Sequence, residues 1–158
     1  MKQTVDAETN GYIIAFGHKT PSAEAGYVTA LDGGTCCLFN TTIPVDDVTY
    51  ARMVVTLTCE RVVIATDRVC AMGWSNGGYM SERLGYEASD VFIGVAVTGS
   101  AVVRGTGYED GLARCNAAFK DGHIDNIHFD GTLDITVPRI CGHDTRERLP
   151  SVPEDFSQ

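Results

Sequence analysis

Several apolar stretches of the chain show no alternation between apolar and polar positions. Residues 11–17, 68–72 and 90–97 are largely apolar, and glycine or a polar residue bounds each stretch. Continuous apolar runs of roughly four to eight residues are typical of strands that are covered on both faces, as in a parallel sheet. A shorter stretch at 126–131 has a similar character. The pattern therefore predicts a strand at each of these positions.

Two other stretches have the three- and four-residue spacing of an amphipathic helix. The acidic pair at 46–47 can cap a helix, and its charge favours the positive end of the helix dipole. One face of the segment that follows, up to about residue 61, carries Val48, Ala51, Val54, Val55 and Thr58. A second helix is predicted over 76–87, where Met80 and Leu84 lie four residues apart on its inner face.

The order strand, helix, strand, helix, strand, loop, strand is typical of a doubly wound α/β domain. We expect a three-layer α/β/α sandwich around a mostly parallel sheet, in one domain that spans residues 1–158. Its core is expected at 11–138, and the residues after it, 139–158, form a polar, linker-like tail. The remaining stretches predict loops: 18–44, and 99–122 with a short helix around 112–120.

Composition and charge exclude several classes of function. Hydrophobic residues make up 44% of the chain and charged residues 21%, which is typical of a globular domain. The formal charge is −9 and no basic cluster stands out, so nucleic acid is not favoured as a partner. No apolar run approaches the roughly 18 residues of a membrane span. The polar start at 1–8 lacks the apolar core of a signal peptide, so no membrane contact is expected.

The chain has six cysteines, an even number that suits an oxidising compartment. Cys59 and Cys70 are expected to be buried thiols, on a helix and a strand. The other four lie in predicted loops and could form disulfides: Cys36, Cys37, Cys115 and Cys141. Neither a Cys-x-x-Cys nor a His-x-x-His spacing is present, so no metal site is expected.

The predicted strand at 68–72 leads directly into the pattern Gly-x-Ser-x-Gly, at Gly73, Ser75 and Gly77, and a predicted helix follows. This pattern is typical of a nucleophile elbow, in which a strained turn exposes a serine hydroxyl above the edge of a sheet. We expect a Cβ at either glycine to collide with the neighbouring strand or helix. The alternative is a glycine-rich turn with an incidental serine.

The segment 67–80 around this pattern resembles the elbow of the polyhydroxybutyrate depolymerase and feruloyl esterase group of α/β-hydrolases. Further segments resemble the same group in the same order: 32–37, 45–48, 87–92, 128–138 and 150–156. The resemblance therefore extends from about residue 11 to the end of the chain, and it implies a partial α/β-hydrolase fold, incomplete at both ends.

The resemblance implies a serine-dependent carboxylic ester hydrolase that needs no metal or organic cofactor. Ser75 would be the nucleophile, Asp134 would orient a histidine base, and the backbone N–H of Asn76 would donate to the oxyanion. The substrate would be a feruloyl-polysaccharide or polyhydroxyalkanoate ester, and the location would be extracellular. For Asp134, a turn aspartate after a strand is the alternative.

The histidines depart from the pattern of that group. Its histidine follows the acid, whereas here only His143 follows Asp134, outside the expected histidine segment. We therefore expect the histidine base to be missing from this chain. We expect His128 to be a packed structural residue and His18 and His123 to lie on the surface.

The start of the chain also departs from that group, because the strand with a His-Gly loop that would lend a second oxyanion donor is not found before residue 11. The alternative function is thus an inactive, truncated hydrolase remnant that acts, if at all, as a binding or interaction domain. An unpaired sheet edge would favour self-association.

Overall fold

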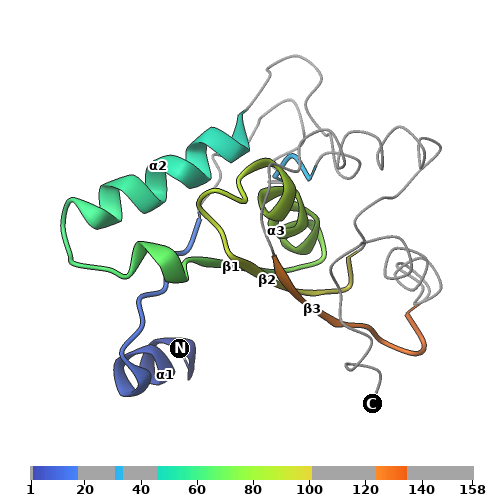
Figure 1. The fold of residues 1–158 in the computed structure, drawn as a ribbon. Coiled ribbons are helices and arrows are strands. Elements are labelled where there is room, and N and C mark those ends of the chain that lie inside the picture. Colours follow the sequence, from blue (N-terminus) through green and yellow to red (C-terminus); the bar gives the residue numbers. More distant parts are fainter. Residues whose placement is uncertain (1, 18–30, 34–45, 101–123, 135–158) are drawn as a thin grey trace, which may run out of the picture.

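The computed structural model describes residues 2–17, 31–33, 46–100 and 124–134 (Figure 1). Along the chain the elements are α1 (Lys2–Asn10), α2 (Asp47–Cys59), the 3₁₀ turn η1 (Thr66–Arg68), β1 (Cys70–Trp74), α3 (Asn76–Glu87), β2 (Gly94–Thr98) and β3 (Asp125–Phe129). Three expected features lie outside the described residues: the helix at 112–120, the four loop cysteines and the tail at 139–158. None of the described helices is long and apolar enough to cross a membrane.

The three strands form a sheet in the order β1-β2-β3, and both pairings are parallel. Trp74 pairs with Thr98 and Thr98 pairs with Phe129, so the strands end together at their carboxyl edge. The expected α/β fold with a parallel sheet and flanking helices is therefore confirmed. Because the strands end in register, the residues that follow them emerge at one edge of the sheet.

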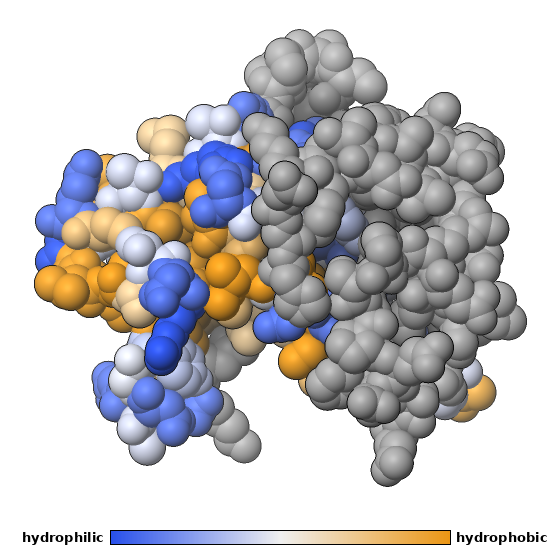
Figure 2. All heavy atoms as spheres, in the orientation of Figure 1, coloured by the Kyte–Doolittle hydropathy of each residue, from blue (hydrophilic) through white to orange (hydrophobic). Residues whose placement is uncertain are grey.

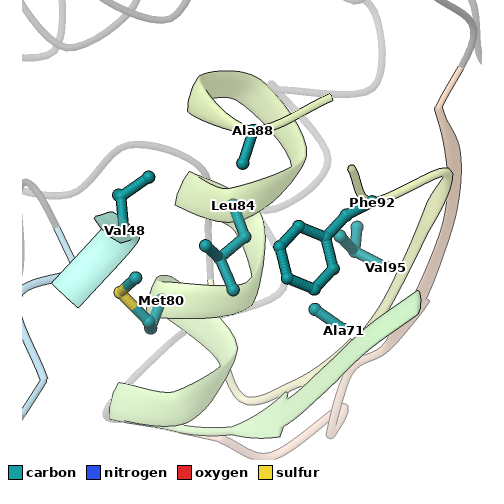
Figure 3. Close-up of a cluster of buried hydrophobic side chains, with 7 residues drawn as sticks. All are labelled: Val48, Ala71, Met80, Leu84, Ala88, Phe92 and Val95. Atoms are coloured by element: carbon teal, nitrogen blue, oxygen red, sulfur yellow. The ribbon is translucent and has the colours of Figure 1, made fainter. Parts of the chain in front are cut away.

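Helix α3 packs across β1 and β2 and buries the main hydrophobic core between itself and the sheet. Met80 and Leu84 lie on its buried face, as expected, and the ring of Phe92 projects into the same space (Figure 3). Full burial of a side chain such as Phe92 contributes about 3 kcal/mol. The buried cluster consists of Val48, Ala71, Met80, Leu84, Ala88, Phe92 and Val95.

Helix α2 begins where the acidic pair predicted. The carboxylate of Asp46 caps it, since Oδ1 accepts from the Thr49 N–H at 2.9 Å and Oδ2 from the Thr49 hydroxyl at 2.6 Å. Its first turn places Val48 in the core beside α3. The other side of α2 carries exposed apolar side chains, among them Met53 and Leu57. Figure 2 shows apolar surface over this region.

The start of the chain differs from the expectation. Residues 12–17 form no strand, and Ile13 and Phe16 are exposed rather than buried. An apolar run becomes a strand only when a neighbouring strand satisfies its backbone groups, and none of the three described strands pairs with this segment. Residues 2–10, for which no element was expected, form α1.

The two described cysteines were placed correctly on their elements, but their predicted burial is wrong. Cys59 is the last residue of α2 and Cys70 the first of β1, and both are exposed free thiols. Each lies at an end of its element, where neighbouring chain covers less of the side chain. Partial desolvation, together with the carboxylate of Asp125, raises the pKa of Cys70.

The boundaries of β1 and β2 also shift towards the carboxyl edge, whereas β3, at Asp125–Phe129, begins and ends earlier than the expected strand at 126–131. β1 begins at Cys70 and runs up to Trp74, whereas the expected strand covered 68–72. β2 begins at Gly94, four residues after the apolar run starts. The first part of the run forms a turn, in which the backbone carbonyl of Ala88 accepts hydrogen bonds from the N–H groups of Val91 and Phe92. The apolar residues of that turn serve the core rather than the sheet.

Candidate active site

Ser75 is the single residue between β1 and α3, at the carboxyl edge of the sheet. Its backbone has φ 52° and ψ −120°, and it is the one non-glycine residue with positive φ in the described part of the chain. A non-glycine residue with this backbone conformation stores about 1–3 kcal/mol of strain, which persists only when the surroundings hold the backbone in place. The structure therefore has the strained strand-to-helix turn that the sequence predicted.

Two backbone hydrogen bonds hold the turn. The Ser75 N–H donates to the carbonyl of Thr98 on β2 at 2.9 Å, and the Ser75 carbonyl accepts from the Tyr79 N–H at 3.0 Å. The first bond attaches the turn to the sheet and the second attaches it to α3. Ser75 is thus fixed from both neighbouring elements.

The glycines around the turn are not equivalent. A Cβ at Gly73 would lie 2.1 Å from the carbonyl oxygen of Gly77, and one at Gly78 would lie 2.6 Å from Oγ of Ser100. A Cβ at Gly77 would meet nothing within 4 Å. The expected steric requirement is therefore confirmed for Gly73 and wrong for Gly77. The close helix approach falls one residue later, at Gly78.

The hydroxyl of Ser75 is exposed and does not cap the helix. Serine at the N-cap position usually accepts a hydrogen bond from the second or third helical N–H, but Ser75 makes no such bond. The next residue, Asn76, supplies the first N–H of α3, which has no partner within the helix and lies at the positive end of its dipole. An anionic oxygen formed beside Ser75 would be stabilised there.

Asp134 lies in the turn after β3, and its N–H donates to the carbonyl of Gly131 at 3.2 Å. Its carboxylate approaches Gly99, the residue directly after β2: a Cβ at Gly99 would lie 3.8 Å from Oδ2 of Asp134 and 3.5 Å from Nε1 of Trp74. Gly99 has φ +59°. The structure thus brings the turn of Ser75 and the carboxylate of Asp134 to the same end of β2.

Among the described residues the one histidine is His128, which lies on β3 one residue before the strand ends. Its Nε2 is 2.7 Å from Oε1 of Glu82, and both side chains are buried between α3 and β3. Nδ2 of Asn126 donates to the other oxygen of Glu82 at 3.3 Å. His128 is therefore a packed structural residue, as expected. The remaining histidines, His18, His123 and His143, lie outside the described residues.

Sequence reasoning missed a short segment, 31–33, that lies against the turn. Nδ2 of Asn76 donates to the Leu31 carbonyl at 2.8 Å, and Oδ1 accepts from the Leu31 N–H at 2.7 Å. The segment lies within a stretch with no hydrophobic period, so the pattern predicted only a long loop. The one signal for it was the resemblance at 32–37.

In the segments that the structure describes, no three His, Cys, Asp or Glu side chains are arranged to hold an ion.

A parallel sheet that delivers a strained, exposed serine into the start of a helix is the arrangement of the α/β-hydrolases. The model of the prolyl oligopeptidase family matches residues 43–123, just over half of the chain, and the chain belongs to this family of serine hydrolases. The matched residues include Ser75 and Asn76 but not Asp134. No curated protein matches the chain.

Proposed function

We propose that the chain is a serine-dependent carboxylic ester hydrolase. Its family supports the serine hydrolase class, and the resemblance of segment 67–80 to the polyhydroxybutyrate depolymerase and feruloyl esterase group supports an ester substrate. The observation that carries the proposal is the backbone of Ser75. Its positive φ holds an exposed hydroxyl that is not used as a helix cap, at the edge where a substrate carbonyl can approach.

In the proposed reaction the Ser75 hydroxyl oxygen attacks the ester carbonyl while a histidine base removes its proton. The backbone N–H of Asn76 donates to the oxyanion of the tetrahedral intermediate. Collapse of this intermediate releases the alcohol, which takes the proton from the histidine, and leaves an acyl-enzyme. Water then attacks the acyl group in the same way and regenerates the serine. Asp134 orients the histidine and stabilises its charged form.

His128 is excluded as the base of this mechanism because its side chain is buried against Glu82, between α3 and β3. His143 is the histidine that follows Asp134 in the sequence, and it lies outside the described residues. Activity measurements therefore test whether the chain has a working base.

A fluorophosphonate probe tests the proposal directly, because it labels a serine only when a base activates the hydroxyl. We expect labelling at Ser75, mapped by mass spectrometry, and none in Ser75→Ala. Ser81→Ala is the matched control: Ser81 lies on the same helix and its hydroxyl donates to the Gly77 carbonyl at 2.9 Å. Asp134→Asn should lower turnover by about 10³- to 10⁴-fold.

Substrate choice is tested with p-nitrophenyl esters beside a prolyl p-nitroanilide, since the family is named for prolyl oligopeptidases. The proposal expects turnover of the esters and little of the anilide. An unlabelled parent that hydrolyses neither substrate would overturn the enzyme proposal and favour an inactive remnant. Labelling with turnover of the anilide alone would overturn the ester substrate but keep the nucleophile.

A further inference from the structure

The side chain of Asn76 joins two parts of the chain that are 45 residues apart. Its amide accepts from the N–H of Leu31 and donates to the carbonyl of the same residue, at 2.7 and 2.8 Å. Both backbone groups of Leu31 are thereby satisfied by one side chain, in the way a neighbouring strand would satisfy them. The side chain of Leu31 packs against the hydrophobic core at the same time.

The next residue of the segment is held from two helices. The Asp32 N–H donates to Oδ2 of Asp47 on α2 at 2.7 Å, and its carbonyl accepts from Nη1 of Arg83 on α3 at 3.0 Å. The carboxylate of Asp32 is also 3.0 Å from the same guanidinium nitrogen. Gly33 fits closely as well, since a Cβ there would lie 2.6 Å from Cβ of Tyr79. Segment 31–33 is thus a fixed part of the structure and not a free loop.

This attachment bears on Ser75, because Asn76 is its direct neighbour. A strained backbone persists only where contacts on both sides hold it. The N–H of Ser75 is held by Thr98 of the sheet on one side. On the other side, the first residue of α3 is held by segment 31–33 through the amide of Asn76.

We propose that Asn76 is a positioning residue, whose side chain anchors the strained turn of Ser75 to segment 31–33. Resting on the proposed function, its role would be to fix the Asn76 N–H relative to the Ser75 hydroxyl. Displacement of reacting groups by about 1 Å lowers rates by about 10²-fold. Loss of the anchor should therefore lower kcat and leave KM nearly unchanged, because the anchor contributes to the transition state geometry and not to substrate contacts.

Two substitutions of Asn76 separate anchoring from helix stability. Asn76→Ala removes both hydrogen bonds to Leu31. Asn76→Asp keeps an acceptor for the Leu31 N–H but places a carboxylate oxygen against the Leu31 carbonyl. An acidic residue in the first turn ordinarily stabilises a helix. If Asn76 served only the helix, the Asp variant would equal or exceed the parent, whereas an anchoring role makes it worse.

Arg52→Gln is the matched control. Arg52 makes a similar set of contacts at the other end of α3, with Nη1 at 2.7 Å from Asp90 and Nη2 at 3.0 Å from the carbonyl of Glu87. It joins α2 to the chain that leaves α3 and makes no contact with the turn of Ser75 in the described part of the chain. Its loss should lower stability without affecting the site.

Amide hydrogen exchange tests the anchoring role of Asn76 and does not require the protein to be catalytically active. In Asn76→Ala we expect the amides of Leu31 and Tyr79 to exchange at least about tenfold faster, as loss of two hydrogen bonds predicts. Asn76→Asp should show a smaller rise, and Arg52→Gln none at these two amides. Unchanged exchange at Tyr79 in Asn76→Ala, or an Asp variant no worse than the parent, would overturn the proposal.

The rate of Ser75 labelling by the fluorophosphonate supplies the second readout. It should fall about tenfold or more in Asn76→Ala and stay at the parent value in Arg52→Gln. An equal fall in both variants would overturn the positioning role, because it would reflect general destabilisation. If the parent itself is not labelled, the proposed function fails, and the exchange of Leu31 and Tyr79 alone decides whether the anchor exists.

Discussion

Gly73 faces the carbonyl of Gly77 so closely that a methyl group at position 73 would come within 2.1 Å of that oxygen. The oxygen is a backbone atom and the backbone fixes the position of a Cβ, so no side-chain rotation can relieve the contact. The two glycines share one motif, yet only at Gly73 would a Cβ point into the contact between strand and helix. At Gly77 a Cβ would point into open space, although this residue is the second one of α3.

Gly73→Ala and Gly77→Ala should therefore have opposite effects on stability. The first should destabilise the fold by about 3 kcal/mol, since backbone has to shift at the turn. The second should be neutral or stabilise it by up to about 1 kcal/mol, because alanine is the better helix former. Urea unfolding of both variants measures the difference. Equal losses would contradict the geometry of the turn.

The elbow could be predicted from sequence because its signals are local. The change from an apolar run to a glycine-flanked serine, followed by Met80 and Leu84 at helical spacing, placed α3 at the residues where it is found. The register of Trp74, Thr98 and Phe129 then brings Ser75 and the turn of Asp134 to one edge, which follows from a parallel sheet.

Features that depend on distant parts of the chain could not be predicted in the same way. Residues 12–17 have the composition of a strand, but composition does not supply a pairing partner. The contact between Asn76 and Leu31 joins positions far apart, and neither residue type indicates the other. For the buried pair of Glu82 and His128, the position of His128 on a predicted strand suggested a packed histidine but not its partner.

His128→Ala should destabilise the protein, because it removes the group beside Oε1 of Glu82 and leaves this buried oxygen without a neighbour to pair with. Leaving a buried polar group without a partner lowers stability by about 1–3 kcal/mol, and by more when the group is charged. Adding Glu82→Gln should restore part of the loss, since a neutral amide is less unfavourable in the core than an unpaired charge. Urea unfolding at neutral pH compares the three proteins. A double variant no more stable than His128→Ala would contradict this account.

Asp46 should make the stability of α2 dependent on pH. Hydrogen bonds from the Thr49 side chain and backbone lower the pKa of Asp46. Because the folded state then binds its proton less tightly than the unfolded chain, the cap contributes fully above the ordinary pKa of about 4. The contribution is lost as the pH falls through the lowered folded value.

Asp46→Ala should therefore cost about 1 kcal/mol at pH 7 and progressively less as the solution is acidified below about pH 4. Asn also caps helices but does not titrate, so Asp46→Asn should retain most of the stability both at neutral pH and in acid. Thermal unfolding of the three proteins between about pH 2 and pH 7 measures how their stabilities depend on pH. A constant difference between parent and Asp46→Ala would show that the charge of Asp46 contributes nothing.

The face of the sheet opposite α3 should promote self-association. Met72 and Ile127 lie in one register row across Ala96, and they are 70% and 51% exposed. Apolar side chains in such a row favour contact with another apolar surface. We expect the protein to elute in size-exclusion chromatography with an apparent mass that rises with concentration.

Ile127→Lys should shift that elution towards the monomer, because it places a charged side chain in the apolar row, where burial against another apolar surface is unfavourable. Val63→Lys is the control, since Val63 is fully exposed in the chain between α2 and η1, away from the sheet. It introduces the same charge and should leave elution unchanged. A parent that elutes as a monomer at every concentration would contradict the prediction, and an equal shift in both variants would attribute association to net charge rather than to this face.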